Sequence, residues 1–376
     1  MMKITLSAIK ADVGSIGGHT KPTEHMIENV KKRVHDAIEA GLLIDGTVTH
    51  TGDDIALIMS HTKGKDSKEI HQFAWDSFIS ATTLADECGC YGAGQDLLAD
   101  APSGNVRGAG PGVAEIEFEF NQKEPRPAES FMIVAADKTG PGAYNLPFFL
   151  SFADPMYCAG LMLPKMAKGF SFEVIDMNNK EGESAITLKA PEDYYKLTTL
   201  LRDNERFGIK AIYSRSYDLQ ALSSSTDRLH TIAGKYTGKD DPIAIIRTQG
   251  IFPAPEEILS PFVKAHYVGG DARGSHNMPL MPVAINTPVT GPYCLPIVAA
   301  IGFSMSSDGS FTRFGFVDFF DNPAWDWVRL RAQEKAIEMR SQGWSGPAML
   351  PYSELEYSGF KTSVTDLLKQ FTIKKR

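Results

Sequence analysis

Short apolar runs that border acidic, glycine-containing loops constrain this chain more than any other feature. Residues 3–10 alternate apolar and polar side chains, and residues 55–61, 131–136 and 243–246 are nearly continuous apolar runs. Each pattern predicts a β-strand. Beside the ends of these runs stand six carboxylates, those of Asp12, Asp53, Asp54, Asp137, Asp240 and Asp241. Loops held at strand ends are common places for chemistry, so we expect an α/β (α+β) protein with a site at these ends.

The remaining periodic patterns predict helices and further strands. Helical spacing of apolar residues marks segments 22–40, 66–87, 192–201, 324–342 and 364–370. Strand patterns mark segments 44–50, 116–120, 170–177, 185–189, 209–214, 297–304 and 311–319. The glutamates that alternate with apolar residues from Glu115 are expected on a solvated face, and segment 269–276 is expected to be a polar loop. Site-like loops occur along the whole length and no linker stands out, so residues 1–376 are predicted to form a single integrated domain.

Composition narrows the classes of function. The net charge of −8 disfavours a general nucleic-acid surface. No apolar run approaches the ~18 residues that a membrane span requires, and the N-terminus is too short and too alternating for a signal peptide. Cys88, Cys90, Cys158 and Cys294 show neither a disulfide framework nor zinc-ligand spacing. A cytoplasmic protein with reduced cysteines, and without membrane or nucleic-acid partners, is the expectation.

If the acidic loops converge, their carboxylates would repel one another unless cations lay between them. Oxygen ligands with few imidazoles favour Mg²⁺ over zinc, and Mg²⁺ shares its ligand shell with substrate phosphates. The implied chemistry is phosphoryl transfer from a phosphorylated metabolite to water. Each loop taken alone also fits an ordinary solvated turn, because Gly, Asp and Pro favour turns.

Lys239 stands between Tyr236 and the Asp240–Asp241 pair. Neighbouring carboxylates would keep its amine protonated, whereas cations bound to those carboxylates would favour the free amine. Such a lysine could form a Schiff base with a ketone, with Tyr236 moving protons beside it. The residues alone leave this open against a lysine that binds phosphate.

Seven motifs in register resemble one family, the bifunctional fructose-1,6-bisphosphate aldolase/phosphatases of archaea and deep-branching bacteria (type V fructose-bisphosphatases). The resemblance runs from Lys3 to beyond Tyr357, nearly the whole chain. The motifs are Ala-Asp-x-Gly-Ser-x-Gly-Gly-His, His-x-Gly-Asp-Asp, Tyr-x-Ala-Gly-Gln-Asp, Ser-Gly-Asn-Val-Arg-Gly, Ala-Asp-Lys-Thr-x-Pro-Gly-Ala-Tyr-Asn, Ala-Gly-Lys-Tyr-x-Gly-Lys-Asp-Asp-Pro and Arg-Gly-Ser-His.

The resemblance implies a four-layer α-β-β-α sandwich assembled as a homo-octamer. It also implies condensation of dihydroxyacetone phosphate with glyceraldehyde 3-phosphate, followed by hydrolysis of the C1 phosphate of fructose 1,6-bisphosphate. Lys239 would then be the Schiff-base lysine, Tyr236 the proton donor and acceptor, and Asp12 the base for water attack. Several Mg²⁺ ions would be held by Asp12, Asp53, Asp54, Gln95, Asp137, Asp240 and Asp241. Substrate would contact His19, Tyr91, Gly104, Asn105, Asp137, Lys138, Gln249, Arg273 and Tyr357.

One departure from the family pattern concerns residues 293–296, Tyr-Cys-Leu-Pro, where an acidic turn before proline is expected. Cys294 would then replace a carboxylate that contacts cation or substrate. An alternative is therefore a Mg²⁺-dependent sugar-phosphate phosphatase without aldolase activity. A sugar-phosphate sensor without catalysis is a second alternative.

Overall fold

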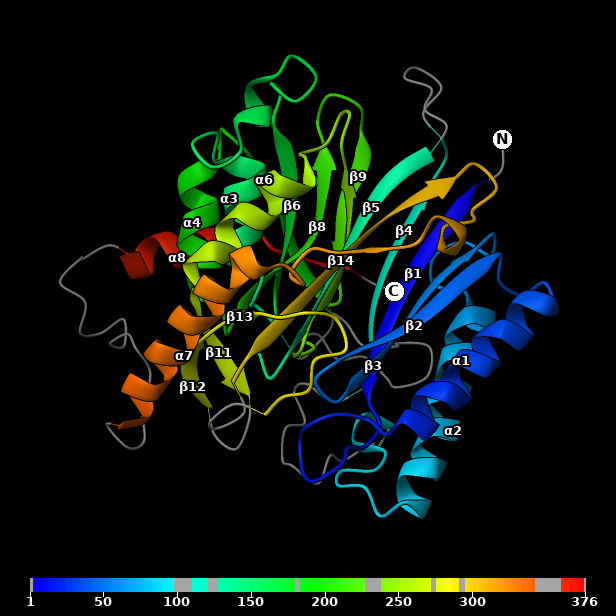
Figure 1. Cartoon of the computed structure of the whole chain (residues 1–376). Coiled ribbons are helices and arrows are strands. Elements are labelled where there is room, and N and C mark those ends of the chain that lie inside the picture. Colours follow the sequence, from blue (N-terminus) through cyan, green and yellow to red (C-terminus); the bar gives the residue numbers. More distant parts are fainter. Residues whose placement is uncertain are drawn as a thin grey trace.

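The computed structural model describes residues 3–97, 110–120, 128–179, 183–226, 238–271, 275–290, 295–341 and 360–374. Within these ranges the chain forms a mixed α/β structure with a small four-stranded sheet, a large ten-stranded sheet and one separate pair of strands (Figure 1). Helices α1 and α2 lie beside the small sheet, and α3, α4, α6 and α8 lie beside the large one.

The small sheet has four antiparallel strands in the order β2-β3-β1-β4. Strand β1 lies inside it and is buried along its whole length. Its residues alternate between two apolar clusters, so that Leu6 and Ala8 face the large sheet while Ile9 and Ala11 face α1 and α2. The predicted strands are confirmed, with bounds β1 Ile4–Asp12, β2 Asp45–Thr51, β3 Asp54–His61 and β4 Gly112–Phe118.

Helices α1 (Glu24–Glu39) and α2 (Lys68–Glu87) cover the outer face of the small sheet. The side chain of Thr23 caps α1 by accepting a hydrogen bond from the backbone N–H of Met26 at 3.1 Å. The helix ends before Gly41, whose φ of +74° lies in the left-handed region. Both predicted helices are therefore confirmed.

The large sheet has ten strands, with β14, β5 and β10 as consecutive neighbours in its half nearer β13. Its strand pairs are antiparallel except for β13 with β14. The strands are β5 Ala128–Asp137, β6 Phe170–Asp176, β7 Glu183–Lys189, β8 Phe207–Ser214, β9 Leu219–Ser224, β10 Ile243–Thr248, β13 Met281–Pro282, β14 Ile297–Ser306, β15 Val317–Asp318 and β16 Thr372–Lys374. The other helices are α3 Asn145–Ala153, α4 Tyr194–Leu201, α6 Pro255–Leu259, α7 Asp326–Ser341 and α8 Phe360–Leu368.

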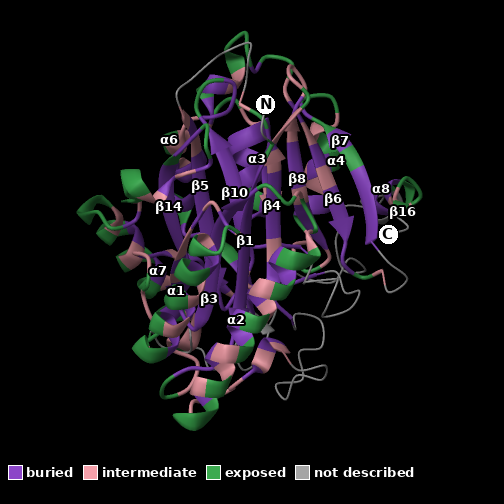
Figure 2. Ribbon diagram, turned by 90° about the vertical axis from the view of Figure 1, so that its right-hand side faces the viewer, coloured by how far each residue is buried: buried purple, intermediate pink, exposed green. Residues whose placement is uncertain are grey.

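An apolar core joins the inner faces of the two sheets. It combines residues of β1, β3 and β4 with residues of β5, β10 and β14, and Figure 2 shows these strands as largely buried. Toward one end the core becomes polar, because the inward alternation of β1 continues from Ala8 to Lys10 and Asp12, which are also buried. The two sheets therefore enclose charged groups at this end.

Two sequence predictions differ from the structure, and one helix was not predicted. Segment 311–319 is a 3₁₀ turn at Thr312–Phe314 followed by the two-residue β15, because the Asp45 carboxylate binds the N–H groups of Phe311 and Thr312 at 2.7 and 2.8 Å. Segment 145–153 is a helix that periodicity did not reveal, since all of its residues except Leu146 are buried. Residues 269–271 and 275–276 belong to the antiparallel pair β11 (Tyr267–Asp271) and β12 (Ser275–Pro279).

The solvated face expected for the alternating glutamates is wrong for Glu115, which is buried on β4, whereas Glu117 is half-buried and Glu119 is exposed. The Glu115 carboxylate accepts hydrogen bonds from the Ser7 hydroxyl at 2.7 Å and from the backbone N–H of Asp66 at 2.7 Å, and it pairs with His71 Nε2 at 3.2 Å. These internal partners satisfy the buried charge, so we assign the group a structural role.

Among the described helices, none has the length and apolar character of a bilayer span.

The inter-sheet core should dominate stability. Replacing the fully buried Ile245 of β10 by alanine removes contacts between the sheets, and Ile245→Ala should lower the free energy of unfolding by ~2–5 kcal/mol in urea titrations. The control Ile79→Ala, at a 43% exposed position of α2, should change it by less than about 0.5 kcal/mol. Equal effects would contradict the assigned core.

Candidate active site and metal centre

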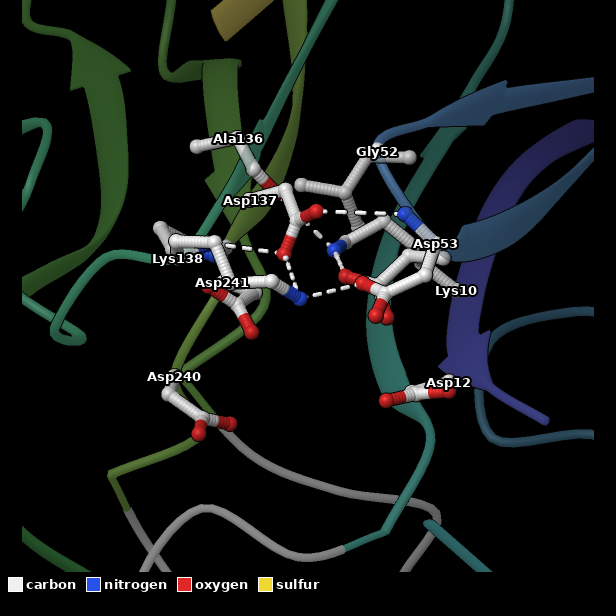
Figure 3. A network of polar contacts seen from close by, with 12 residues as sticks. Lys10, Asp12, Gly52, Asp53, Ala136, Asp137, Lys138, Asp240 and Asp241 are labelled. Atoms are coloured by element: carbon white, nitrogen blue, oxygen red, sulfur yellow. Dashed lines mark hydrogen bonds and ion pairs between the residues drawn. The ribbon is translucent and has the colours of Figure 1, made fainter. Parts of the chain in front are cut away.

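Four chain segments meet at the polar end of the inter-sheet core. Asp12 ends β1 and pairs in register with Asp54, the first residue of β3. Asp137 ends β5, and Asp241 lies just before β10, which pairs antiparallel with β5. Strand pairing therefore brings together the carboxylates predicted from separate loops, as Figure 3 shows.

The β2–β3 turn contacts the end of β5 directly. The backbone N–H of Asp53 donates to Asp137 Oδ2 at 3.2 Å. Gly52 has φ of +57°, and a Cβ at this position would lie only 1.6 Å from Asp137 Oδ2. Only glycine leaves room for the Asp137 carboxylate at this turn.

The ends of β5 and β10 hold two residues in the left-handed region, Lys138 with φ of 61° and Asp241 with φ of 48°. Such conformations cost about 1–3 kcal/mol each and tend to occur at functional sites. They are braced against each other, since the N–H of Thr139 donates to Asp241 Oδ1 at 2.7 Å and the N–H of Asp241 donates to the Thr139 carbonyl at 3.0 Å. The two strand ends thus form one rigid unit.

Two buried ammonium groups lie among these carboxylates. Lys138 Nζ contacts Asp53 and lies 3.0 Å from Asp137 Oδ1. Lys10 Nζ contacts Asp54 and donates to the Ala136 carbonyl at 2.9 Å. Lys10 was not predicted as a site residue from the sequence. The sequence indicated it only by its position on β1, on the same face as Leu6 and Ala8.

The ionisation of the cluster is strongly perturbed. Burial and the neighbouring Asp53 raise the pKa of Asp12 well above its usual value. Burial also raises the pKa of Asp137 against the opposing charge of Lys138, and burial with the Asp240 charge raises the pKa of Asp241. Burial alone would raise the pKa of Asp53, but Lys138 and several hydrogen bonds lower it. Further positive charge, from protons or cations, is therefore favoured here.

The donor set fits a hard divalent cation. Ligand atoms of Asp53, Asp54 and Asp137 lie within 4.8 Å of one another, and so do those of Asp12, His19 and Asp53. His19 was predicted to contact substrate, but its Nδ1 lies 3.4 Å from Asp53 Oδ2, so it is also a candidate ligand. Its ring packs edge-on against Tyr91 with centroids 4.8 Å apart.

Lys239 lies beside this cluster and is only 4% exposed. Its Nζ donates to Asp240 Oδ1 at 2.7 Å and lies 3.4 Å from Asp96 Oδ2. Burial alone would lower the pKa of Lys239, but Asp240 and Asp96 raise it well above its usual value. The carboxylates of Asp240 and Asp96 therefore favour the protonated form of this amine.

Asp96 is a second residue that the sequence prediction missed, although Gln95 beside it was included. Both belong to the 3₁₀ turn Gln95–Leu97. Burial raises the pKa of Asp96 to about 6, against the opposing charge of Lys239. Its signals in the sequence were its position after the glycine-rich loop at residues 92–94 and its place as the last residue of the motif Tyr-x-Ala-Gly-Gln-Asp.

The remaining predicted residues fall into two groups. Gln249 follows β10, whose six residues span on the order of 20 Å from the Asp241 end; its contact with substrate stays a prediction. Gly104, Asn105, Tyr236, Arg273 and Tyr357 lie outside the described residues, as does Cys294.

Comparison with known proteins shows which family the chain belongs to. Residues 3–372 match the family model described as fructose-1,6-bisphosphatase. The chain is 51% identical over 372 residues to a fructose-1,6-bisphosphate aldolase/phosphatase of Thermus thermophilus, which covers 99% of this chain and 100% of the relative. Proteins of the same name are 46% identical in Cenarchaeum symbiosum (98% and 94% covered) and 45% identical in Methanothermobacter marburgensis (95% and 95% covered).

Gly52 offers a test of the metal centre. Gly52→Ala places a methyl group on the Asp137 carboxylate and should weaken Mn²⁺ binding, measured by electron paramagnetic resonance, by at least ~10-fold. The matched control Gly41→Ala has a similar positive φ but open space around its Cβ, so it should lose only about 1–2 kcal/mol of stability. Equal Mn²⁺ affinity in both variants would contradict the site.

Metal binding should depend on pH with a defined sign. Burial raises the pKa values of Asp12, Asp137 and Asp241, which favours protons on these carboxyls in the metal-free protein, and cations must displace any protons bound there. The affinity of the chelator-treated protein for Mg²⁺ should therefore rise between pH 6 and pH 8, by about tenfold per pH unit for each proton released. Calorimetry in two buffers of different ionisation enthalpy counts these protons. A pH-independent affinity without proton release would contradict the assignment.

Proposed function

Because the chain belongs to the fructose-1,6-bisphosphatase family, we propose that it catalyses two reactions in one site. The first is aldol condensation of dihydroxyacetone phosphate with glyceraldehyde 3-phosphate through a Schiff base. The second is hydrolysis of the C1 phosphate of fructose 1,6-bisphosphate to give fructose 6-phosphate. The observation that carries the proposal is the buried Lys239 amine beside a carboxylate cluster that attracts cations.

The cofactor of this site is Mg²⁺, with several ions for each site. Oxygen donors fit its preference, and the residues that would hold it are Asp12, Asp53, Asp54, Gln95, Asp137, Asp240 and Asp241. When bound, Mg²⁺ offsets the charge on phosphate oxygens and makes a bound water more acidic. Asp12 is the base that takes a proton from the attacking water. The N–H of Gly14 holds the Asp12 carboxylate by donating to Oδ1 at 3.0 Å.

In the aldol step Lys239 attacks the ketone of dihydroxyacetone phosphate, and Tyr236 moves protons beside it. The Lys239 ammonium must first become a free amine, and cations held by Asp240 and Asp241 would favour this by offsetting the negative charge around it. Substrate and its phosphates would be oriented by His19, Tyr91, Gly104, Asn105, Asp137, Lys138, Gln249, Arg273 and Tyr357.

At the level of the whole molecule we propose a four-layer α-β-β-α sandwich formed by one integrated domain. Three separate apolar clusters support it, one on each outer face of the two sheets and one between them. Exposed apolar side chains on α7, at Trp327, Leu330 and Ile337, support a homo-oligomer, which the resemblance makes an octamer. The free thiols of Cys88 and Cys158 fit a cytoplasmic location.

Lys239→Ala should reduce condensation of the two trioses by at least ~10³-fold, because it removes the amine proposed to form the Schiff base. Measurable phosphatase activity on fructose 1,6-bisphosphate should remain. Borohydride with dihydroxyacetone phosphate should label Lys239 in the unaltered protein, as detected by mass spectrometry. The control Lys31→Ala, at an exposed position of α1, should keep both activities.

A label on a different lysine would overturn the assignment of Lys239. A chain that hydrolyses the bisphosphate with Mg²⁺ but never forms it from the two trioses would be the phosphatase without aldolase activity. Absence of both reactions, with and without chelator, would favour the sensor.

A further inference from the structure

The carboxylate of Asp96 is held by the backbone of two other chain segments. Its Oδ2 accepts from the N–H of Asp12 at the end of β1 at 2.9 Å, and its Oδ1 accepts from the N–H of Gly110 at 3.2 Å. The side chain is 6% exposed. Both oxygens therefore have a defined orientation before any contact with a lysine is considered.

The same Oδ2 atom lies 3.4 Å from Lys239 Nζ. In the described part of the chain, one other carboxylate forms an ion pair with this amine, that of Asp240 at 2.7 Å. The two differ in setting, because the Asp240 side chain is less buried than that of Asp96 and is a proposed cation ligand. A cation on Asp240 would compete with Lys239, whereas Asp96 would keep its contact.

The stem of Lys239 is also confined. A Cβ on Gly112, the first residue of β4, would lie 3.1 Å from Lys239 Cγ. The N–H groups of Gly238 and Lys239 both donate to the Thr226 carbonyl, at 2.7 and 3.1 Å. With the backbone and the stem so placed, the orientation of the terminal amine depends on its carboxylate partners.

We propose that Asp96 is a positioning residue for Lys239, which it holds at a fixed place relative to the end of β1 during formation of the Schiff base. This rests on the proposed role of Lys239. The Asp96 carboxylate holds the groups proposed for the two reactions close together, because its Oδ2 contacts both the backbone N–H of Asp12 and the amine of Lys239.

The Lys239 nitrogen beside Asp96 carries one positive charge both before and after formation of the Schiff base. A protonated lysine and a ketone give a protonated imine and one water, so that the C–N bond forms, the C–O bond breaks and one positive charge stays on nitrogen. The Asp96 carboxylate neither gains nor loses a proton overall. It stabilises the positive nitrogen of the starting ammonium and of the protonated imine, as a preorganised charge does in a water-poor site, while the amine that attacks between these two states is neutral.

The test compares Asp96→Asn, which removes the charge at nearly constant size, with Asp96→Glu, which keeps it. Asp36→Asn, at an exposed position of α1, is the matched control. For each protein we would measure the borohydride trapping rate across dihydroxyacetone phosphate concentrations, the phosphatase kcat and the affinity for Mn²⁺.

In Asp96→Asn the maximal trapping rate should fall by roughly 10- to 100-fold more than the phosphatase kcat. The half-saturating concentration of dihydroxyacetone phosphate and the Mn²⁺ affinity should stay within about threefold. Asp96→Glu should recover a substantial part of the trapping rate, because the negative charge is restored. A purely structural Asp96 would not separate the two reactions in this way.

Equal losses of trapping, phosphatase activity and Mn²⁺ binding in both Asp96 variants would overturn the proposal, and so would normal trapping in Asp96→Asn. If Asp96→Asn does not fold, Asp96→Glu decides. Trapping well above that of Lys239→Ala supports the charge-based role, and trapping no higher than Lys239→Ala excludes it. Failure of the unaltered protein to trap substrate at Lys239 would instead contradict the proposed function.

Discussion

Electrostatic repulsion among buried carboxylates is the constraint on which the rest of this structure depends. Asp12, Asp53, Asp54 and Asp137 lie in the interior of the protein, where charges are poorly screened. Two lysines from within the fold, Lys10 and Lys138, supply part of the balancing charge. The raised pKa of Asp12 and of Asp137 shows that this balance is incomplete. The site therefore retains an attraction for protons and cations.

The two sheets make such a charged interior possible. Their shared apolar core continues up to Ala8 on β1 and Ala135 on β5, and the charged groups begin directly beyond it. Backbone pairing of β1 with β3, and of β5 with β10, places the strand ends without relying on the side chains themselves. Rigid strand ends can keep like charges close because the packing of the core opposes their separation.

Sequence reasoning identified much of this arrangement because strand ends are visible in the apolar pattern. The convergence of Asp12, Asp53, Asp54, Asp137 and Asp241 followed from loops that each stand beside an apolar run. Roles that depend on which face a side chain takes were harder to predict. Glu115 has the spacing of an outer-face residue but is buried under α2, where its carboxylate contacts His71. Periodicity in the sequence cannot indicate that a helix covers that face.

Lys10 and Asp96 were missed for a different reason. A lysine inside an alternating strand pattern is ordinarily solvated, and only the second sheet, distant in sequence, encloses Lys10. Asp96 acquires its partners from β1, from Gly110 and from Lys239, none of which is a neighbour in the chain. Contacts of this kind depend on tertiary structure, which single-sequence patterns do not contain.

The burial of β1 on both faces has a consequence for how the chain reaches its native state. A shift of β1 by one residue against β3 would exchange its faces, turning Lys10 and Asp12 toward the apolar helices and Ile9 and Ala11 toward the other sheet. Such a misaligned molecule would place unpaired charges in hydrocarbon surroundings, at a high energetic cost. Lys10 and Asp12 therefore disfavour this shifted register of β1 during folding, in addition to their place in the charged cluster.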